Sequence, residues 1–261
     1  MNVLLLAAVA SVAALSVAWA VARATGDGGW VDAIWALSAG AIAAAAALWP
    51  ASDAALSRQA LAAALVALWG ARLGVYIARR TAAAERPDPR YERLVAEWGG
   101  WNARAWRFLM IQAATVVVLA LAVRAAAVRP EATLDARDAL AAAIVLAAVV
   151  GEALADRQMA AFRRDPRNRG KVADRGLWGW SRHPNYFFEW LVWLAWPAMA
   201  LDPAVPASWL TLPAALMMWW LLNHVSGVPM LEAEMLRSRP EAYRAYQARV
   251  SRFFPFPPKP R

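Results

Sequence analysis

The stretch VLLLAAVASVAALSVAWAV, residues 3–21, decides the fold class of this chain. It contains no charged side chain, and an apolar run of about 20 residues crosses the hydrocarbon core of a bilayer as a helix. A cleaved signal peptide would carry positive charge before the apolar run, but no Lys or Arg precedes Val3. We therefore expect residues 3–21 to form a membrane-spanning helix.

Similar apolar runs follow along the chain, separated by glycine, proline and arginine residues that end them. They predict an all-α, polytopic membrane protein with seven transmembrane helices. The expected spans are residues 3–21, 31–49, 55–78, 105–128, 139–162, 184–201 and 207–225. Residues 81–102 are polar and predict a loop with a short helix. Residues 230–250 predict one amphipathic, charge-rich helix that lies on the inner membrane surface.

The composition excludes several classes of protein. Hydrophobic residues make up 61% of the 261 residues, against about 45–50% in a typical soluble domain, so a soluble enzyme and a disordered chain are both excluded. The chain has no cysteine, which excludes a disulfide framework, a thiolate zinc site and a cysteine nucleophile. It has two histidines, His183 and His224, so we expect no histidine-rich metal site.

Basic residues are concentrated in three segments. The formal net charge is +9, and 22 of the 28 Lys and Arg residues fall within residues 79–107, 157–182 and 237–261. Each segment adjoins an apolar run, as the positive-inside rule predicts for cytoplasmic loops. Seven spans then place the N-terminus outside and the C-terminus in the cytoplasm. Because membrane topology explains most of these arginines, we expect no nucleic-acid partner.

Polar residues at membrane depth point to function, because a charged side chain there costs at least ~2.5–3.5 kcal/mol. Glu152 and Asp156 are four residues apart and therefore share one helix face. A purely structural interpretation is an ion pair with Arg72 or Arg157. The functional interpretation is that the two carboxylates accept hydrogen bonds from the hydroxyl or amide groups of a ligand. The residues alone leave both interpretations open.

A second group of polar residues surrounds the start of the span expected at 184–201. Asn185 and Glu189 repeat the four-residue spacing, and Arg182 and His183 lie beside the free N–H groups that open the helix. Such a helix start is suited to an anion.

Two aromatic residues, Trp180 and Tyr186, flank this helix start and could stack on a planar ring. The basic residues just upstream suit a second phosphate; they are Arg163, Arg164, Arg167, Arg169 and Lys171. Topology explains each arginine by itself, but the whole group favours an anionic, aromatic cofactor.

These motifs resemble those of a known family. The string Gly176-Leu177-Trp178, followed by SRHPNY at 181–186 and by Glu189, resembles the steroid 5α-reductase family, and more closely its bacterial branch of integral-membrane proteins. The resemblance extends over nearly the whole chain from about residue 30. Further matches are Asp32 with Trp35, residues 68–73, residues 88–91, Gln112, Asp156 with Gln158, residues 226–229 and the Pro-Pro-Lys tail at 257–259.

The resemblance implies a seven-helix enzyme of the bacterial inner membrane that uses NADPH. The reaction would reduce a carbon–carbon double bond conjugated to a ketone, in a lipophilic substrate such as a 3-oxo-4-ene steroid that enters from the bilayer. It implies one monomeric domain, 1–261, with residues 1–130 mainly on the substrate side and 139–261 mainly on the cofactor side. The implied cofactor-binding residues are Arg72, Arg90, Tyr91, Glu152, Asp156, Arg163, Lys171, Trp180, Arg182, His183, Asn185, Tyr186 and Glu189.

At the substrate end the sequence departs from the animal enzymes of this family, in which a glutamate and a tyrosine bind the ketone. Trp69 occupies the position of that tyrosine, Asp32 is the candidate for the glutamate, and Tyr76 could substitute for the missing hydroxyl. The expected catalytic residues are therefore Asp32, Tyr76 and Trp69. Asp32 could donate a hydrogen bond only if protonated, which burial favours by raising a carboxyl pKa.

Two other functions fit parts of the sequence. An S-adenosylmethionine-dependent methyltransferase of the isoprenylcysteine carboxyl methyltransferase type also carries a His-Pro-x-Tyr turn and a downstream glutamate. Its cofactor has no phosphate, so it does not require the basic segment at 163–171. A transporter or lipid-binding scaffold would predict that Asn223 and His224 line a path through the last span. The simpler interpretation of these two residues is hydrogen bonding between helices.

Overall fold

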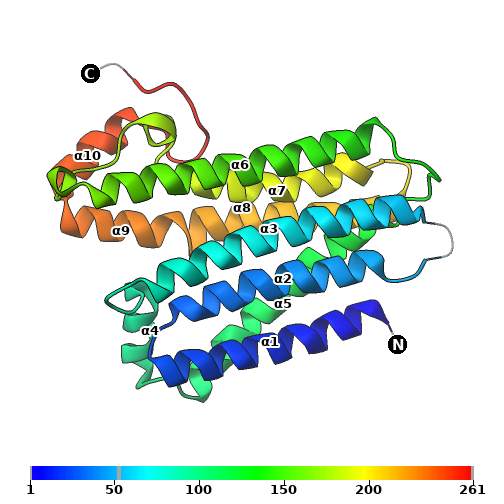
Figure 1. Cartoon of the computed structure of the whole chain (residues 1–261), viewed down its shortest axis with the longest axis horizontal. Helices are drawn as coiled ribbons and strands as arrows, with labels where there is room; N and C mark the ends of the chain where they lie inside the picture. The colour runs from blue at the N-terminus through cyan, green and yellow to red at the C-terminus, as the bar shows by residue number, and fades with distance from the viewer. Residues whose placement is uncertain (1, 52–53, 260–261) are drawn as a thin grey trace. The chain divides into compact units, whose positions relative to one another are not determined.

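The computed structural model describes residues 2–51 and 54–259, and this part of the chain is all α-helical without a β-strand (Figure 1). The all-α prediction is therefore confirmed. The helices are α1 (Val3–Thr25), α2 (Gly29–Leu48), α3 (Leu56–Ala82), α4 (Pro89–Trp98), α5 (Ala103–Ala127), α6 (Ala136–Arg164), α7 (Pro184–Ala200), α8 (Leu212–Trp220), α9 (Val228–Ser238) and α10 (Pro240–Arg249). Short 3-10 turns cover residues 166–168, 176–179 and 206–211, and a π turn covers residues 221–225.

Six segments of the described chain are long and apolar enough to cross a membrane. They are α1, α2, α3, α5, α6 and the continuous run Pro206–Ser238. The protein is therefore a multi-pass membrane protein, as expected, and the first five of these helices match predicted spans to within a few residues. The span expected at 184–201 forms α7, whose 17 residues reach only about 25 Å. Seven spans and their orientation thus stay predictions.

The prediction of one continuous helix over residues 230–250 is wrong. The helix stops at Arg239, whose φ of −149° and ψ of 59° are not helical, and a new helix begins at Pro240. The cause is local, because a proline ring disfavours the α conformation of the residue before it. The span expected at 207–225 is also irregular: it ends in a π turn, in which the Ser226 N–H donates to the Leu221 carbonyl over 3.0 Å.

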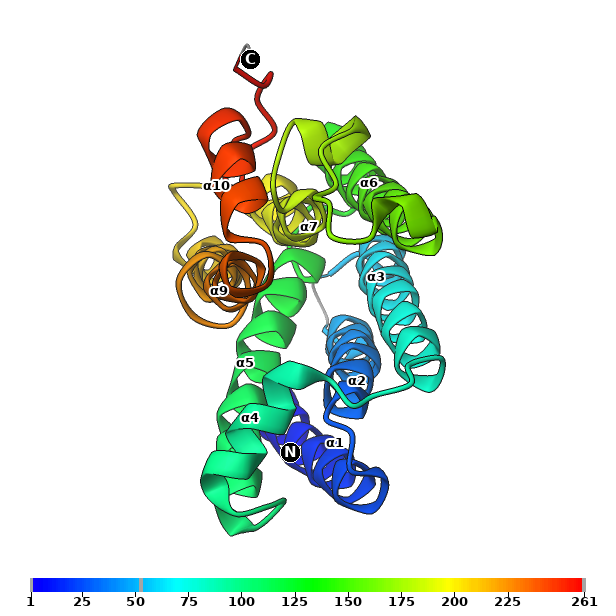
Figure 2. The same cartoon turned by 90° about the vertical axis from the view of Figure 1, so that its left-hand side faces the viewer.

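Two compact units make up the chain. Unit 1 consists of residues 1–142 and 196–214, and unit 2 of residues 143–195 and 215–261. In unit 1, α1, α2 and α3 lie side by side (Figure 1), and α4 lies across the start of α5 (Figure 2). In unit 2, α10 packs on α9. Arg261, the last member of the third basic segment, lies outside the described residues.

Small residues set the register between α2 and α3. A Cβ atom on Gly40 would lie 2.8 Å from the Cα atom of Gly70, so the two backbones touch there. Close contact between small residues is how helices associate in membranes. At the other end of the pair, a Cβ on Gly29 would meet the Thr81 side chain at 2.5 Å. This antiparallel register brings Asp32 on α2 to the level of Tyr76 on α3.

At the opposite end of α3, unit 1 contains a cluster of charges, which we call the arginine cluster: the buried Arg58, Arg129 and Asp138, and the exposed Asp135. The Arg58 Nε donates to Asp138 Oδ1 over 2.9 Å, and both side chains are almost completely buried. The remaining N–H groups of Arg58 reach Asp138 Oδ2 and three backbone carbonyls of residues 129–133. Arg129 donates to both aspartates. The cluster therefore joins α3 to the segment that links α5 to α6.

Candidate functional site

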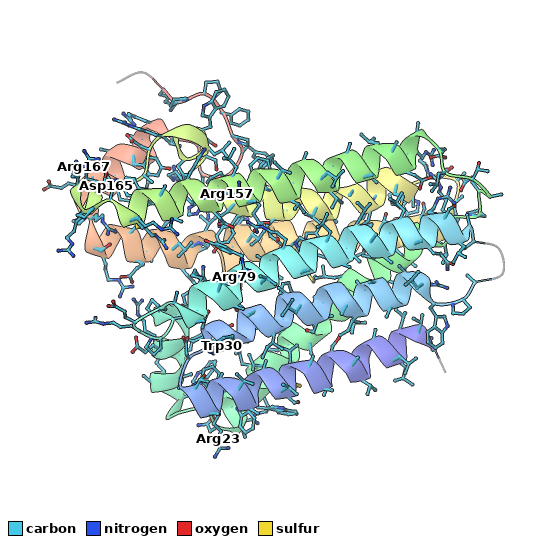
Figure 3. The ribbon with its side chains drawn as sticks, viewed as in Figure 1. Arg23, Trp30, Arg79, Arg157, Asp165 and Arg167 are labelled. Carbon is cyan, nitrogen blue, oxygen red and sulfur yellow. The ribbon has the colours of Figure 1, made fainter. Side chains whose placement is uncertain are left out.

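The two carboxylates predicted to share a face of α6 are buried in unit 2. Glu152 is 4% exposed and Asp156 is 7% exposed. Arg157, labelled in Figure 3, is exposed, and within the described residues no ion pair joins it to either carboxylate. The structural interpretation that pairs them with Arg157 is therefore wrong, whereas burial of two acidic groups on one helix face agrees with the sequence.

The segment that carries the Gly-Leu-Trp motif is fastened to α6 beside these carboxylates. The Trp178 Nε1–H donates to the Ala155 carbonyl over 3.0 Å, and the Leu177 N–H donates to Gln158 Oε1 over 2.9 Å. A Cβ atom on Gly176, whose φ is +59°, would lie 2.6 Å from the same Gln158 oxygen. Gly176 is thus required both by its backbone conformation and by the close approach of α6.

A cavity of about 400 Å³ lies at the C-terminal end of α6, and most of its polar lining is cationic. We call it the basic pocket. Its lining residues are Phe162, Arg163, Arg164, Asp165, Pro166, Asn168, Arg169, Gly170, Lys171 and Arg239. The loop that forms it is held by the Asn168 side chain, which donates to the Phe162 carbonyl over 2.9 Å, and by Gly170 with a φ of +80°. The predicted phosphate-binding residues Arg163 and Lys171 therefore face one cavity.

The cations of the basic pocket differ from their neighbour Arg167. Arg163 and Lys171 are exposed and form no ion pair within the described residues. Arg167, which does not line the pocket, pairs with Asp165 over 2.8 Å (Figure 3). The hydrogen bond from Arg167 lowers the pKa of Asp165, so this carboxylate stays charged and neutralises Arg167. The pocket itself keeps a positive potential.

Arg182 and His183, predicted to bind the cofactor, are directed at α9 and α10 in the structure. The Arg182 Nε donates to Glu232 Oε1 over 2.7 Å, and its Nη1 donates to the Val250 carbonyl over 2.8 Å. His183 Nε2 lies 3.1 Å from Glu232 Oε1, and Gln247 donates to Glu232 Oε2 over 2.9 Å. These contacts fix the turn before α7.

Glu232 is the site residue that the sequence reasoning missed. It lies 49 residues after His183, in a segment predicted only as a surface helix. One feature of the sequence could have indicated Glu232: it lies in the helix predicted directly after residues 226–229, which match the steroid 5α-reductase family motif. Burial lowers the pKa of His183, and Glu232 opposes this effect by its hydrogen bond and charge.

The C-terminal tail also holds this turn. The Arg182 N–H donates to the Ser251 carbonyl over 2.8 Å, the Ser181 Oγ donates to the Phe253 carbonyl over 2.8 Å, and the Phe256 N–H donates to the Trp180 carbonyl over 3.1 Å. Residues 251–256 of the tail therefore lie along residues 180–182 and hold them in place.

The start of α7 presents the remaining predicted residues of unit 2. Tyr186 stacks on the His183 ring with centroids 5.8 Å apart. Glu189 is 5% exposed and accepts a hydrogen bond from the Trp193 indole over 3.4 Å. Asn185 is half-buried, and the Trp180 side chain is 49% exposed. Trp180 thus offers an open ring face, whereas one face of Tyr186 is already covered.

In unit 1, Asp32 is held by two residues of α4. The Arg90 Nη2 donates to Asp32 Oδ2 over 2.6 Å, and the Tyr91 hydroxyl donates to Asp32 Oδ1 over 2.7 Å. Arg90 also pairs with Asp88 at the start of α4. Burial, followed by the charge of Asp32, raises the pKa of Tyr91 well above its ordinary value, so the phenol stays protonated and donates. Both oxygens of Asp32 therefore accept a hydrogen bond from α4.

The other predicted residues of unit 1 share a face of α3. Trp69, Arg72 and Tyr76 are three and four residues apart, which places them along one side of the helix. Trp69 is completely buried and meets Trp35 edge-on at 6.2 Å. The Arg72 guanidinium lies 5.3 Å from the centroid of the Tyr76 ring.

Asn223 and His224 form local contacts in the π turn. The Asn223 amide donates to the Trp219 carbonyl of its own helix over 3.0 Å, and His224 meets the Trp219 ring edge-on. The Asn223 side chain therefore bonds within its own helix and not between helices, while the Asn223 carbonyl accepts a hydrogen bond from Arg252 of the tail over 2.6 Å. Within the described residues, no group of three or more His, Cys, Asp or Glu side chains could hold a metal ion.

The fold and these sites define a multi-pass, all-helical membrane protein with buried carboxylates and a basic pocket. The chain belongs to the family described as "Protein of unknown function (DUF1295)", which matches residues 18–250. This family is related to steroid 5α-reductase-like membrane proteins.

One relative is the "Uncharacterized protein C594.04c" of Schizosaccharomyces pombe, which is 38% identical over 81 residues. The alignment covers 31% of this chain and 22% of that protein, so the chain spans about a fifth of the relative's length. No solved structure matches the chain significantly.

Proposed function

We propose that this protein is an NADPH-dependent reductase of the carbon–carbon double bond in an α,β-unsaturated, lipophilic ketone, with a 3-oxo-4-ene steroid as the preferred substrate class. The observation that carries the proposal is the basic pocket at the end of α6, the helix that also bears Glu152 and Asp156. Family membership supports the reaction class through the relation to steroid 5α-reductase-like proteins.

The chemistry of unit 2 fits the parts of a phosphorylated dinucleotide. Uncompensated guanidinium and ammonium groups bind phosphate, and buried carboxylates accept hydrogen bonds from ribose hydroxyls and from a carboxamide. Seven residues separate Asp156 from Arg163, which corresponds to a rise of about 10 Å along α6. One helix therefore presents acceptors for hydroxyl groups and, further along, cations for phosphates.

In the proposed site, Arg163 and Lys171 hold phosphates, while Glu152 and Asp156 hold hydroxyl and amide groups. Asn185, Tyr186 and Glu189 line the nicotinamide and its ribose, with Trp180 and the Arg182–His183 turn beside them. When bound, NADPH supplies the hydride.

The residues that we propose for substrate binding lie in unit 1. As hydride reaches the β-carbon, negative charge develops on the ketone oxygen, and a hydrogen-bond donor aimed at that oxygen stabilises it. The α-carbon of the resulting enolate then takes a proton from water or a side chain, which gives the saturated ketone. Asp32 accepts hydrogen bonds from Arg90 and Tyr91, so it is poorly suited to donate. We therefore assign the donor role to the Tyr76 hydroxyl and a positioning role to Asp32. The buried Trp69 ring shapes the pocket, and Arg72 lies over Tyr76.

The proposal includes the topology. The basic segments at 79–107, 157–182 and 237–261 face the cytoplasm of a bacterial cell, and the N-terminus lies outside. NADPH enters from the cytoplasm, and the substrate enters a monomeric enzyme laterally from the inner membrane.

The test uses full-length protein in a mild detergent. Bound small molecules are first identified by mass spectrometry, and binding of NADPH, NADH and S-adenosylmethionine is then measured by calorimetry. Absorbance at 340 nm follows turnover with 3-oxo-4-ene steroids. We expect NADPH to bind and to be consumed. Binding of S-adenosylmethionine without NADPH binding would overturn the proposal in favour of a methyltransferase, and binding of neither cofactor would favour a non-enzymatic role.

A further inference from the structure

A second cavity lies in unit 1, at the end of α1 and the start of α5. It is open, has a volume of about 790 Å³ and contains three tryptophans. We call it the tryptophan groove. Its lining residues are Trp19, Arg23, Gly99, Trp101, Asn102, Ala103 and Trp106. The proposed reductase site uses none of these residues.

The indole N–H groups of two of these tryptophans are already engaged. Trp19 Nε1 donates to the Asn102 carbonyl over 3.3 Å, and Trp106 Nε1 donates to Ser16 Oγ over 3.0 Å. These bonds hold the two rings in place and leave their apolar faces as the surface of the groove. Tryptophans at the ends of membrane-spanning helices lie at the level of lipid headgroups.

Arg23 gives the groove its charge. Its guanidinium lies 5.2 Å from the centroid of the Trp19 ring, and the side chain is exposed (Figure 3). Within the described residues no carboxylate pairs with it. The charge is therefore available to an anion from outside the protein.

An apolar stripe on α1 leads to this cation. Leu5, Val9 and Val12 are 56%, 60% and 43% exposed, and they continue through Ser16 and Trp19 to Arg23 at helical spacings of three and four residues. Eighteen residues separate Leu5 from Arg23, a rise of about 27 Å, close to the ~30 Å thickness of a bilayer core. An acyl chain spans one leaflet, about half of this core, so a chain whose headgroup reaches Arg23 covers the half of the stripe from Val12 to Trp19.

We propose that the tryptophan groove binds an anionic phospholipid. The phosphate pairs with Arg23, the glycerol backbone packs on the Trp19 and Trp106 rings, and one acyl chain lies along the stripe of α1. A phosphate diester with no ammonium group fits a groove whose charge is positive, because no second charge in the headgroup is repelled by Arg23. The inference does not depend on the reductase proposal.

The experiment measures lipid retention by native mass spectrometry. Full-length protein in a mild detergent is mixed with equal amounts of palmitoyl-oleoyl phosphatidylglycerol and palmitoyl-oleoyl phosphatidylcholine. We expect the unmodified protein to retain phosphatidylglycerol preferentially. Arg23→Gln should reduce this preference by about fivefold, the effect of one basic residue at an anionic lipid surface, and Arg23→Lys should keep most of it.

Arg79→Gln is the matched control, because Arg79 is also an exposed arginine in the last turn of a spanning helix but lines no part of the groove. It should leave the preference unchanged. Equal retention of the two lipids, or an Arg23→Gln variant that behaves as the unmodified protein, would overturn the proposal. Displacement of the lipid by an equal concentration of sn-glycerol 3-phosphate would overturn it as well, because the site would then recognise a free phosphate ester.

Discussion

The arginine cluster of unit 1 and the basic pocket of unit 2 use the same side chain in opposite ways. Arg58 is completely buried, and every one of its N–H groups meets a carboxylate or a carbonyl. Arg163 and Lys171 are exposed, line a cavity of about 400 Å³ and form no ion pair within the described residues. An arginine whose N–H groups are all bonded within the protein has a structural role, whereas cations that line a cavity and outnumber its one carboxylate, Asp165, favour binding of an anion.

Breaking the arginine cluster should have the largest effect on stability. Arg58→Ala leaves Asp138 buried without its main partner, and such a change typically costs about 3–5 kcal/mol. We expect a marked loss of thermal stability in detergent, measured by the fraction that stays monodisperse after heating. Arg137→Ala is the control, because Arg137 is exposed on the same turn of α6 as Asp138. A similar loss in both variants would contradict a structural role specific to the cluster.

Removing charge from the basic pocket should change ligand affinity and leave stability nearly unchanged. Charge-assisted hydrogen bonds contribute about 1.5–3 kcal/mol, and exposure reduces that value, so Arg163→Ala and Lys171→Ala should each weaken NADPH binding by about tenfold. Calorimetry measures the dissociation constants.

The double variant Asp165→Ala with Arg167→Ala supplies the control for the pocket, since it removes from the same loop an ion pair that is already neutral and leaves the net charge unchanged. It should bind NADPH as the unmodified protein does. An equal loss of NADPH affinity in all three variants would contradict this prediction. It would show that a cation already paired with a carboxylate matters as much to binding as one that lines the pocket.

Tyr91 allows a smaller test in unit 1. Tyr91→Phe keeps the ring stacked on Trp101 but removes the hydrogen bond to Asp32, and we expect a loss of about 1 kcal/mol in the free energy of unfolding. Asp32 would keep its ion pair with Arg90. If Asp32 only positions residues around the substrate, the turnover rate should fall by less in Tyr91→Phe than in Tyr76→Phe. The reverse order of the two turnover rates would show that the proposed donor is wrong.

Local patterns in the sequence predicted most of the helices. Contacts between residues far apart in the sequence could not be predicted from such patterns. The apolar runs predicted the ends of α1, α2, α3, α5 and α6 to within a few residues, because the length of an apolar run can be read directly from the sequence. The break at Arg239 had a visible cause in Pro240, but the charge pattern on both sides favoured one amphipathic helix.

The same limit applies to the sites. Pocket-lining cations in the 163–171 segment could be predicted because they are adjacent in sequence. Arg58 lies within an apolar run, and its partner Asp138 is 80 residues away, so nothing in the sequence pairs them. Glu232 was missed for the same reason. Its contact with Arg182 helps to fix the turn, and cofactor binding by Arg182 stays a prediction.

His183 is intermediate between the arginine cluster and the basic pocket, because it is buried and, among the residues that the structure describes, Glu232 is its acidic partner. Since its pKa in the folded protein is below the ordinary value of about 6.5, the unfolded chain binds a proton first as the pH falls. The free energy of unfolding should therefore decrease as the pH is lowered from 7.5 through 6.5 to 5, by less than the loss expected for Arg58→Ala. His183→Gln should flatten this part of the profile, measured by thermal unfolding at each pH, whereas His224→Gln, at an exposed histidine, should leave it intact. If His224→Gln flattened the profile instead, burial of His183 would not be the cause of the pH dependence, and the network around Glu232 would tolerate a charged imidazole.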